Sequence, residues 1–454
     1  MKEEPTIKAA VLTNSDKTLA GPIIVSANPP MLTASAKATD ETRLIINKSI
    51  KYLIEVRICL VIMVIILYIN SYYNGWVMLR KYPELFKDHN SHYPIYDSKF
   101  PFPEYIKETK KIISATRSNL QQDIDSVIHA NSPFEYRPPH AKQGALLIHG
   151  LLDCPFQMQE IGMRLYQKGI LVRSILLPGH GTVPGDLLNI KLETWLQAVQ
   201  YGVESLAREV DTTYLIGFST GASLGLYHAL KNPSLFSKLV LIAPAIKIRS
   251  YLDFSTNLFP LLGRFWQRAN WMTIAPENDY AKYQSIPFNA VYQVYRLTQS
   301  IKELSKTKPP LNPLFIILSQ ADSTVSAKAS IQYFQQYEQA QSKLLLYCNP
   351  LIEKNDPQIE TRGANYPELN IHHFSHVCLP ISPDNPHYGL KGNYFETSHA
   401  HNKNNIIYGS FNKIENSFYD FLFRKKIVKM QHRRLTFNPD FEHMIQEIEQ
   451  FIEI

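Results

Sequence analysis

The sequence predicts an α/β fold built around a mostly parallel central sheet with helices on both faces. Short apolar runs indicate this fold, because such runs are typical of buried strands. The stretches between the runs have helical patterns, as expected where crossover helices join parallel strands. The expected strands comprise residues 144–148, 171–176, 213–218, 239–243 and 314–318.

The clearest of the expected helices extends from Leu192 to Val210. Its apolar residues recur every three or four positions, which places them on one face of a helix. These residues are Leu192, Trp195, Leu196, Val199, Val203 and Leu206. A stripe of this kind packs on a core, so we expect Trp195 in the interior and not at a ligand.

Ser219 lies in the pentapeptide Gly217-Phe218-Ser219-Thr220-Gly221, between an apolar run and a second expected helix. A G-x-S-x-G sequence at a strand-to-helix turn forms a nucleophile elbow. The glycines leave room for a sharp turn that raises the serine hydroxyl above the sheet. The sequence therefore predicts Ser219 as a nucleophile, and the alternative is a glycine-rich loop without a catalytic role.

The strand expected at residues 144–148 leads into His149-Gly150-Leu151, which places a backbone turn beside the serine. Attack by a serine leaves a negative charge on the carbonyl oxygen, and two fixed N–H groups stabilise that charge. We expect the backbone amides of Leu151 and Thr220 to be these oxyanion-hole donors. His149 is expected to hold the turn and to have no catalytic role.

An acid and then a base should follow the serine along the chain. Asp322 comes just after the expected strand 314–318, where a carboxylate can orient an imidazole, although loop aspartates also serve as turn or cap residues. Several histidines follow it: His372, His373, His376, His387, His399 and His401. His376 is the predicted base because it lies in an apolar, strand-like stretch, and His373 and His387 are the alternatives.

A further motif is Leu177-Pro178-Gly179-His180-Gly181-Thr182. With this loop and the residues above, the chain resembles the α/β-hydrolase superfamily, and within it the monoacylglycerol lipase and bacterial carboxylesterase branch. The resemblance implies that Ser219 attacks an ester carbonyl, that His376 takes the serine proton and that Asp322 orients the histidine. It also implies Leu151 and Thr220 as the oxyanion donors.

The resemblance extends from residue 142 to residue 454 and departs from the branch in one place. Residues 349–370, between the predicted acid and base, look like an insertion. The resemblance also implies a lid at about residues 245–310, a stretch rich in aromatic side chains that suit an apolar acyl chain. The alternative is a helical subdomain that buries those rings in its own core.

Composition and pattern divide the chain into four parts. They are a disordered segment at 1–45, a transmembrane anchor at 46–80, a linker with an amphipathic helix at 81–141 and an α/β-hydrolase domain at 142–454. The first part is rich in Thr, Ala, Ser, Lys and Pro without a clear period, which is typical of disorder.

The membrane anchor is predicted from the apolar run Ile58–Ile69. A helix needs about 20 residues to cross a bilayer, and the run reaches that length if it extends to Leu79 through aromatic residues that favour an interface. The alternatives are a cleaved signal peptide and a buried core helix. A slight excess of Lys and Arg before the run favours a cytoplasmic N-terminus and an extracytoplasmic catalytic domain.

The remaining composition excludes several function classes. The net charge is +7, but no nucleic-acid-binding module accompanies the basic residues 424–434. Such a run is typical of a solvated face, and contact with anionic lipid headgroups is the better of the functional interpretations. No cofactor is expected. No metal site is expected either, because the chain lacks H-E-x-x-H and paired Cys-x-x-Cys sequences.

Cys154 and Cys378 form a disulfide only if their loops meet. The sequence does not indicate an oligomeric state.

Two classes of function follow from these patterns. The first is a membrane-anchored serine hydrolase that cleaves lipid-like or short acyl esters, with thioester hydrolysis and acyl transfer as close variants. The second is a binding protein that keeps the fold without turnover, because a fold alone does not determine function. A serine, an acid and a histidine in the expected order favour the enzyme.

Overall fold

The computed structural model describes residue 75 and residues 77–90, 97–117, 123–248, 267–337, 339–351, 356–394, 406–410 and 431–452. These residues belong to one compact unit. The predicted disordered segment 1–45 and the apolar run Ile58–Ile69 lie outside the described residues. Within the described part of the chain, no helix is long and apolar enough to cross a membrane.

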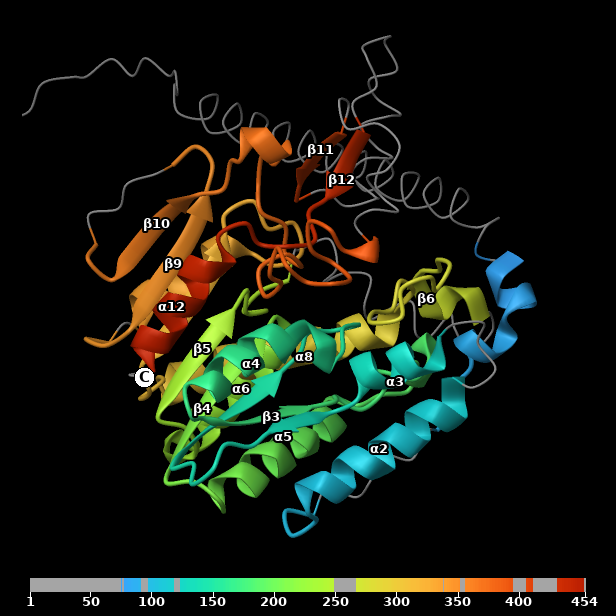
Figure 1. Cartoon of the computed structure of the whole chain (residues 1–454), viewed down its shortest axis with the longest axis horizontal. Coiled ribbons are helices and arrows are strands. Elements are labelled where there is room, and N and C mark those ends of the chain that lie inside the picture. The colour runs from blue at the N-terminus through green and yellow to red at the C-terminus, as the bar shows by residue number, and fades with distance from the viewer. Residues whose placement is uncertain are drawn as a thin grey trace, which may run out of the picture. The chain divides into compact units, whose positions relative to one another are not determined.

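An eight-stranded sheet forms the centre of this unit, in the order β1-β3-β2-β4-β5-β8-β9-β10 (Figure 1). Only β1 pairs antiparallel to its neighbour, and the other neighbours are parallel. The mostly parallel sheet predicted from the sequence is therefore confirmed. The strands are β1 (Phe134–Tyr136), β2 (Gln143–Ile148), β3 (Leu171–Ile175), β4 (Thr212–Phe218), β5 (Lys238–Ile242), β8 (Leu314–Ser319), β9 (Lys343–Cys348) and β10 (Ile359–Gly363).

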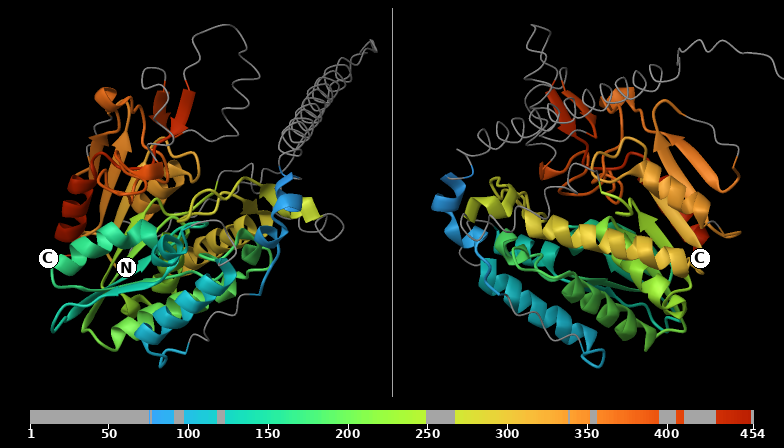
Figure 2. Two further views of the ribbon diagram at one scale, coloured as in Figure 1. Left: turned by 45° about the vertical axis from the view of Figure 1, so that its right-hand side comes forward. Right: turned by 180° about the vertical axis from the view of Figure 1, so that it is seen from behind.

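Helices cover both faces of the sheet. On β2, the side chain of Leu146 packs against Gly202 of α5, whereas the next residue, Leu147, packs against Gly162 of α4. Successive strand residues point to opposite faces, so α4 and α5 cover opposite faces. Figure 2 shows the helices from two further sides. They are α2 (Phe102–Arg117), α3 (Ile124–Asn131), α4 (Gln159–Gln167), α5 (Leu192–Ala207), α6 (Thr220–Lys231), α8 (Phe288–Thr307), α9 (Ala327–Gln336) and α12 (Phe441–Phe451).

The sheet begins before the domain boundary that the sequence predicts at residue 142. Strand β1, at Phe134–Tyr136, is its antiparallel edge. The amphipathic helix α2 also packs on this unit, because Tyr105 is buried against Tyr201 of α5, with ring centroids 5.2 Å apart. Residues 102–136 are therefore part of the folded unit and not a free linker.

A second, smaller apolar cluster joins the segment around residues 77–90 to the predicted lid region. Its buried members are Leu79, Leu85, Phe86, Val183, Trp271 and Ile274. Phe86 ends the short helix η1 (Pro83–Phe86), and its ring meets Trp271 edge to face at 5.2 Å. The described part of the lid region thus buries Trp271 in a cluster made mostly of residues outside that region, and the lid remains a prediction.

The predicted lid range contains two further kinds of structure. Helix α8 packs against α6 and α5, as a covering helix of the sheet does. A short antiparallel pair, β6 (Trp271–Thr273) and β7 (Ile286–Pro287), precedes it. Residues 249–266, which include five of the aromatic residues expected in the lid, lie outside the described residues.

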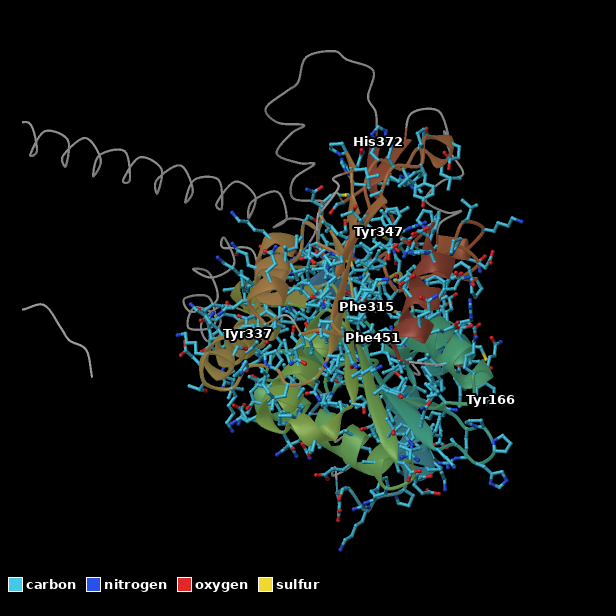
Figure 3. The ribbon with its side chains drawn as sticks, turned by 90° about the vertical axis from the view of Figure 1, so that its left-hand side faces the viewer. Tyr166, Phe315, Tyr337, Tyr347, His372 and Phe451 are labelled. Carbon is cyan, nitrogen blue, oxygen red and sulfur yellow. The ribbon has the colours of Figure 1, made fainter. Side chains whose placement is uncertain are left out.

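The stretch that the sequence marks as an insertion adds a strand to the sheet. Within residues 349–370, β10 pairs in parallel with β9 and becomes the far edge. The C-terminal helix α12 returns to this end of the sheet, where Phe451 packs on Phe315 of β8 at 5.5 Å (Figure 3). A separate parallel pair, β11 (Ile406–Gly409) and β12 (Gln431–Arg434), lies between β10 and α12 in the chain.

Candidate active site

Ser219 occupies a sharp turn between β4 and α6. Its φ is +53° and its ψ is −115°, a backbone conformation that non-glycine residues rarely adopt. A β-carbon on Gly221 would lie 2.3 Å from the carbonyl oxygen of Ile148, and one on Gly217 would lie 2.5 Å from the Ala222 backbone. Glycine is therefore required on both sides of the serine, which explains the spacing of the motif.

The three residues predicted as nucleophile, base and acid meet in one chain of hydrogen bonds. The Nε2 atom of His376 lies 2.9 Å from Ser219 Oγ, and its Nδ1 atom lies 2.6 Å from Asp322 Oδ2. All three side chains are buried, with residue exposures of 6% or less. This is the geometry in which an imidazole accepts the serine proton while a carboxylate fixes its tautomer.

Asp322 is held as a carboxylate by the loop that follows β8. Burial alone would raise the pKa of Asp322, but the His376 imidazole and backbone donors outweigh it, so the pKa lies below its usual value. The backbone N–H groups of Thr324 and Val325 donate to Oδ1 at 2.7 and 3.0 Å. The other carboxylate oxygen therefore remains directed at His376.

The segment that carries His376 is a series of turns and not the strand-like stretch expected from the sequence. Hydrogen bonds fix this segment in place of strand pairing. Ser319 Oγ, at the end of β8, donates to the carbonyl of Phe374 at 2.7 Å. The Phe374 ring packs on Tyr347 of β9 at 4.7 Å, so the base is attached to the strands beside the acid.

The turn after β2 contains the predicted oxyanion donor Leu151. Among the residues that the structure describes, neither the N–H of Leu151 nor that of Thr220 donates to a protein acceptor. Thr220 is the first residue of α6, where backbone N–H groups have no partner within the helix. Both amides are thus available to a substrate oxygen, and their role remains a prediction.

Two buried histidines shape this turn. His180 Nε2 accepts a hydrogen bond from the N–H of Leu152 at 3.0 Å, and His149 Nε2 accepts one from the N–H of Leu177 at 3.0 Å. Burial lowers the pKa of His149 to about 4 and that of His180 to about 3, so both rings are neutral acceptors at neutral pH. His149 thus has the structural position expected of it.

The position of His180 explains the role of the L-P-G-H-G-T loop, which the sequence indicates only as part of a family resemblance. The L-P-G-H-G-T loop carries a ring that fixes the Leu152 amide, next to the predicted oxyanion donor. The motif is the sequence signal for this contact, because a histidine between two glycines can approach another backbone closely. Both of those glycines, Gly179 and Gly181, have positive φ values of 85° and 75°.

The alternative bases are held elsewhere. His387 is buried, and its Nε2 atom lies 3.0 Å from Asp279 Oδ1, while the Tyr388 hydroxyl donates to Asp279 Oδ2 at 2.7 Å. For His373, burial and the adjacent His372 lower the pKa. Neither ring makes a hydrogen bond to Ser219 or Asp322 among the contacts of the described residues.

The cysteines of this region do not form the disulfide that the sequence left open. Cys154 and Cys378 are both buried free thiols. Cys154 Sγ donates to the carbonyls of Ala130 and Ala281, and Cys378 Sγ donates to the carbonyl of Ser375. Burial raises the pKa of each thiol, to about 12 for Cys378, so both remain protonated at neutral pH.

One group of side chains in the described part of the chain has donor atoms close enough for a metal ion. It consists of Glu360 on β10 and His443 and Glu447 on α12. Lys343, at the start of β9, already pairs with both carboxylates. Because the triad lies at the carboxyl ends of the strands, this group is at the opposite end of β9, and we assign it to the attachment of α12.

Comparison with known proteins covers only part of the chain. Residues 139–349 match the family described as serine aminopeptidase, S33. This match includes Ser219 and Asp322 but ends before His376. The position of the base therefore rests on the geometry of this chain.

Two relatives have names that indicate lipid esters. The chain is 25% identical over 227 residues to a thermostable monoacylglycerol lipase of Bacillus sp. (strain H-257), covering 49% of this chain and 89% of the relative. It is 22% identical to a monoglyceride lipase homolog of Monkeypox virus, covering 46% of this chain and 80% of that one. A monoacylglycerol lipase structure from Paleococcus ferrophilus is 18% identical with a TM-score of 0.40, covering 47% of this chain and 87% of that one.

Proposed function

We propose that this chain, a lipase-like hydrolase of the α/β-hydrolase superfamily that resembles monoacylglycerol lipase, cleaves carboxylic esters through an acyl-enzyme on Ser219. The observation that carries the proposal is the hydrogen-bond chain from Ser219 through His376 to Asp322. A binding protein would have no need for a serine held in a strained turn and aligned with a buried imidazole and carboxylate.

The first half of the reaction forms the acyl-enzyme. Ser219 Oγ attacks the ester carbonyl carbon while His376 Nε2 takes the hydroxyl proton, and Asp322 stabilises the positive imidazolium. The carbonyl oxygen becomes an oxyanion, which the N–H groups of Leu151 and Thr220 stabilise. The intermediate then collapses, the bond to the alcohol breaks, and His376 gives its proton to the leaving alcohol oxygen.

The second half releases the acid. Water attacks the acyl carbon and transfers a proton to His376, and the carbon–oxygen bond to Ser219 then breaks as His376 returns the proton to the serine. The products are the free acid, the alcohol and the unchanged enzyme. A thiol ester would react by the same steps, and an alcohol in place of water would make the reaction an acyl transfer.

A lipid-like substrate is proposed from two features. The names of the two relatives refer to monoacylglycerol or monoglyceride lipases. The predicted lid range also supplies aromatic side chains, among them the half-buried Tyr280 and the buried Tyr283, whose N–H donates to the carbonyl of Leu152 at 2.9 Å. This contact joins the lid range to the oxyanion turn, as a lid over an acyl chain requires.

A membrane anchor is part of the proposal and rests on sequence. The apolar run Ile58–Ile69 precedes the described unit, with basic residues on both sides and a small excess before it. We propose that this run holds the hydrolase at a lipid surface, with the catalytic domain on the extracytoplasmic side. Such a position would bring the active site close to lipid esters.

The test is a hydrolysis screen with the full-length protein. p-Nitrophenyl esters of rising acyl length, a monoacylglycerol and an acyl thioester are compared, each with Ser219→Ala as the control. We expect turnover of the oxygen esters and the monoacylglycerol by the wild-type protein and none by the variant. Equal activity of the two proteins, or a folded wild-type protein that turns over no ester, would contradict the proposal.

A further inference from the structure

Strand β12 reaches back to the acid of the triad. Arg434, the last residue of β12, donates from Nη2 to Thr324 Oγ1 at 3.1 Å, across 110 residues of sequence. Thr324 in turn donates its backbone N–H to Asp322 Oδ1 at 2.7 Å. The Arg434 guanidinium is thus connected to the Asp322 carboxylate through one residue, Thr324.

The residue after Arg434 also binds the segment that carries the base. The carbonyl of Leu435, the residue after Arg434, accepts a hydrogen bond from Ser375 Oγ at 2.6 Å, and Ser375 directly precedes His376. Two consecutive residues therefore bind the acid loop and the base loop. We call this arrangement the β12 bridge, defined by Arg434 and Leu435.

The neighbouring strand β11 supports the bridge. The N–H of Leu435 donates to the carbonyl of Gly409 at 3.1 Å, and Ser410 Oγ accepts from the N–H of Ser323 at 3.1 Å. The bridge therefore has backbone attachments on the acid side as well as through its own strand pair.

The charge of Arg434 is not used up by a direct ion pair. Among the described residues, no carboxylate lies within salt-bridge distance of its guanidinium, and its buried Nε has no acceptor. Burial lowers the pKa of Arg434, while Asp322 and Asp153 oppose that change. The side chain therefore remains a cation.

The other charged and titratable groups around this position are few. Arg434 is influenced by four of them: Asp322, Asp153, Cys378 and Tyr394. Cys378 is held protonated by burial, and burial also raises the pKa of Tyr394, so neither carries charge at neutral pH. Asp153 is paired with Lys282 at 3.1 Å. His376 itself faces Asp322 and Ser219.

We propose that Arg434 is a positioning residue for the triad, which fixes the acid loop through Thr324 and, with Leu435, joins it to the loop of the base. This role rests on the proposed function, because it assumes that His376 is the base. It lies outside residues 139–349, the part of the chain that matches the known family.

The proposal has a signature in how kcat and KM respond. A residue that positions the triad acts on the chemical step, so its loss lowers kcat and leaves KM unchanged. A conservative replacement that can still donate to Thr324 should restore most of kcat. A residue with only a structural role would lower the stability of the protein and leave the kcat of the folded enzyme unchanged.

The test compares four variants of the full-length protein with a p-nitrophenyl ester at neutral pH. Arg434→Met should lower kcat about 10-fold or more with KM unchanged. Arg434→Lys, which can still donate to Thr324, should recover most of kcat. Thr324→Val, which loses only the hydroxyl acceptor, should lower kcat several-fold with KM unchanged. Arg433→Met is the matched control, because it removes the same charge from the same strand on the opposite face.

An unchanged kcat in Arg434→Met, or an equal loss in Arg433→Met, would overturn the proposal. Should Arg434→Met not fold, Thr324→Val decides, and a wild-type kcat in that variant would overturn the positioning role. If the wild-type protein cleaves no ester, the rates of labelling by a fluorophosphonate are compared. Slower labelling of Arg434→Met than of Arg433→Met would support the positioning role even though the proposed function had failed, and equal rates would overturn it.

Discussion

The Nε2 atom of His180 accepts a hydrogen bond from the backbone N–H of Leu152 at 3.0 Å, which links the L-P-G-H-G-T loop to the turn that carries the predicted oxyanion donor. The acceptor must be the neutral ring, because a protonated imidazole has no lone pair. Folding therefore favours the unprotonated form of His180. Acid should weaken this link before it affects the strands.

This link gives a pH prediction for His180→Gln. The pKa of His180 is lowered from 6.5 to about 3. Its contribution to the free energy of unfolding is complete above pH 6.5 and is lost as the pH falls from 6.5 towards 3, by at most about 1.4 kcal/mol per pH unit. We expect the variant to be less stable by about 1–3 kcal/mol at pH 7.5, and the difference to shrink towards pH 4.

Urea unfolding of both proteins at several pH values measures this difference. The comparison must be made between the two proteins, because other buried groups titrate as well. His149 acts in the same direction, whereas Glu160 and Glu277, whose pKa values burial raises to about 7, gain stability as the pH falls. A difference that stays constant from pH 7.5 to 4 would show that His180 is not a neutral acceptor.

His376 and His387 should separate catalysis from stability. His376→Ala should lower kcat/KM by at least about 1,000-fold, because the serine loses its base. His387→Ala should leave most activity but cost about 1–3 kcal/mol of stability, because it removes a buried partner of Asp279. Steady-state kinetics and thermal unfolding of both variants make the comparison. An inactive, stable His387→Ala protein would reverse the assignment of the base.

The segment near residue 80 should be needed for folding, whereas the chain before it should be needed for membrane binding. Phe86 is fully buried against Trp271. Phe86→Ala should therefore cost about 3–5 kcal/mol. Val77, which is 47% exposed, provides the control, and Val77→Ala should change stability by less than about 0.5 kcal/mol.

The corresponding truncation should end before this cluster. A protein that lacks residues 1–74 should fold, keep its activity and leave the membrane fraction, because Leu79 and Phe86 remain in place. Cell fractionation with an activity assay checks this. Full-length protein found only in the soluble fraction would rule out the anchor, and an inactive truncated protein would show that the unit needs more of the N-terminus.

Five of the central strands, β2, β3, β4, β5 and β8, could be predicted because each is a continuous apolar run between turn residues. The interior strand β9 was not predicted, although it is also apolar. The role of Ser219 could be predicted from the glycines on both sides of it, and that of Asp322 from its place after β8, because both signals are local in the sequence. His376 was chosen for a strand-like setting that it does not have. The structure instead fixes its segment through side-chain hydrogen bonds, which leave little trace in the sequence.

The parts that could not be predicted depend on pairing between distant segments. In the edge strands β1 and β10, Ile359 is the one buried residue, and the other residues are partly or fully exposed. Neither strand therefore shows a continuous apolar run. The contact between Arg434 and Thr324 joins residues 110 apart. In the sequence, Arg434 belonged to a basic stretch interpreted as a lipid-facing surface, and only the fold brings it to the acid loop.

The most direct test of the account is identification of the residue that a fluorophosphonate modifies. The full-length protein is treated with the probe at neutral pH, digested, and its peptides are sequenced by mass spectrometry, with Ser219→Ala and Asp322→Asn treated in parallel. The account predicts one modified residue, Ser219, no labelling of Ser219→Ala, and labelling of Asp322→Asn slowed by orders of magnitude. Modification of a different serine, or an unlabelled Ser219 in folded protein, would contradict it.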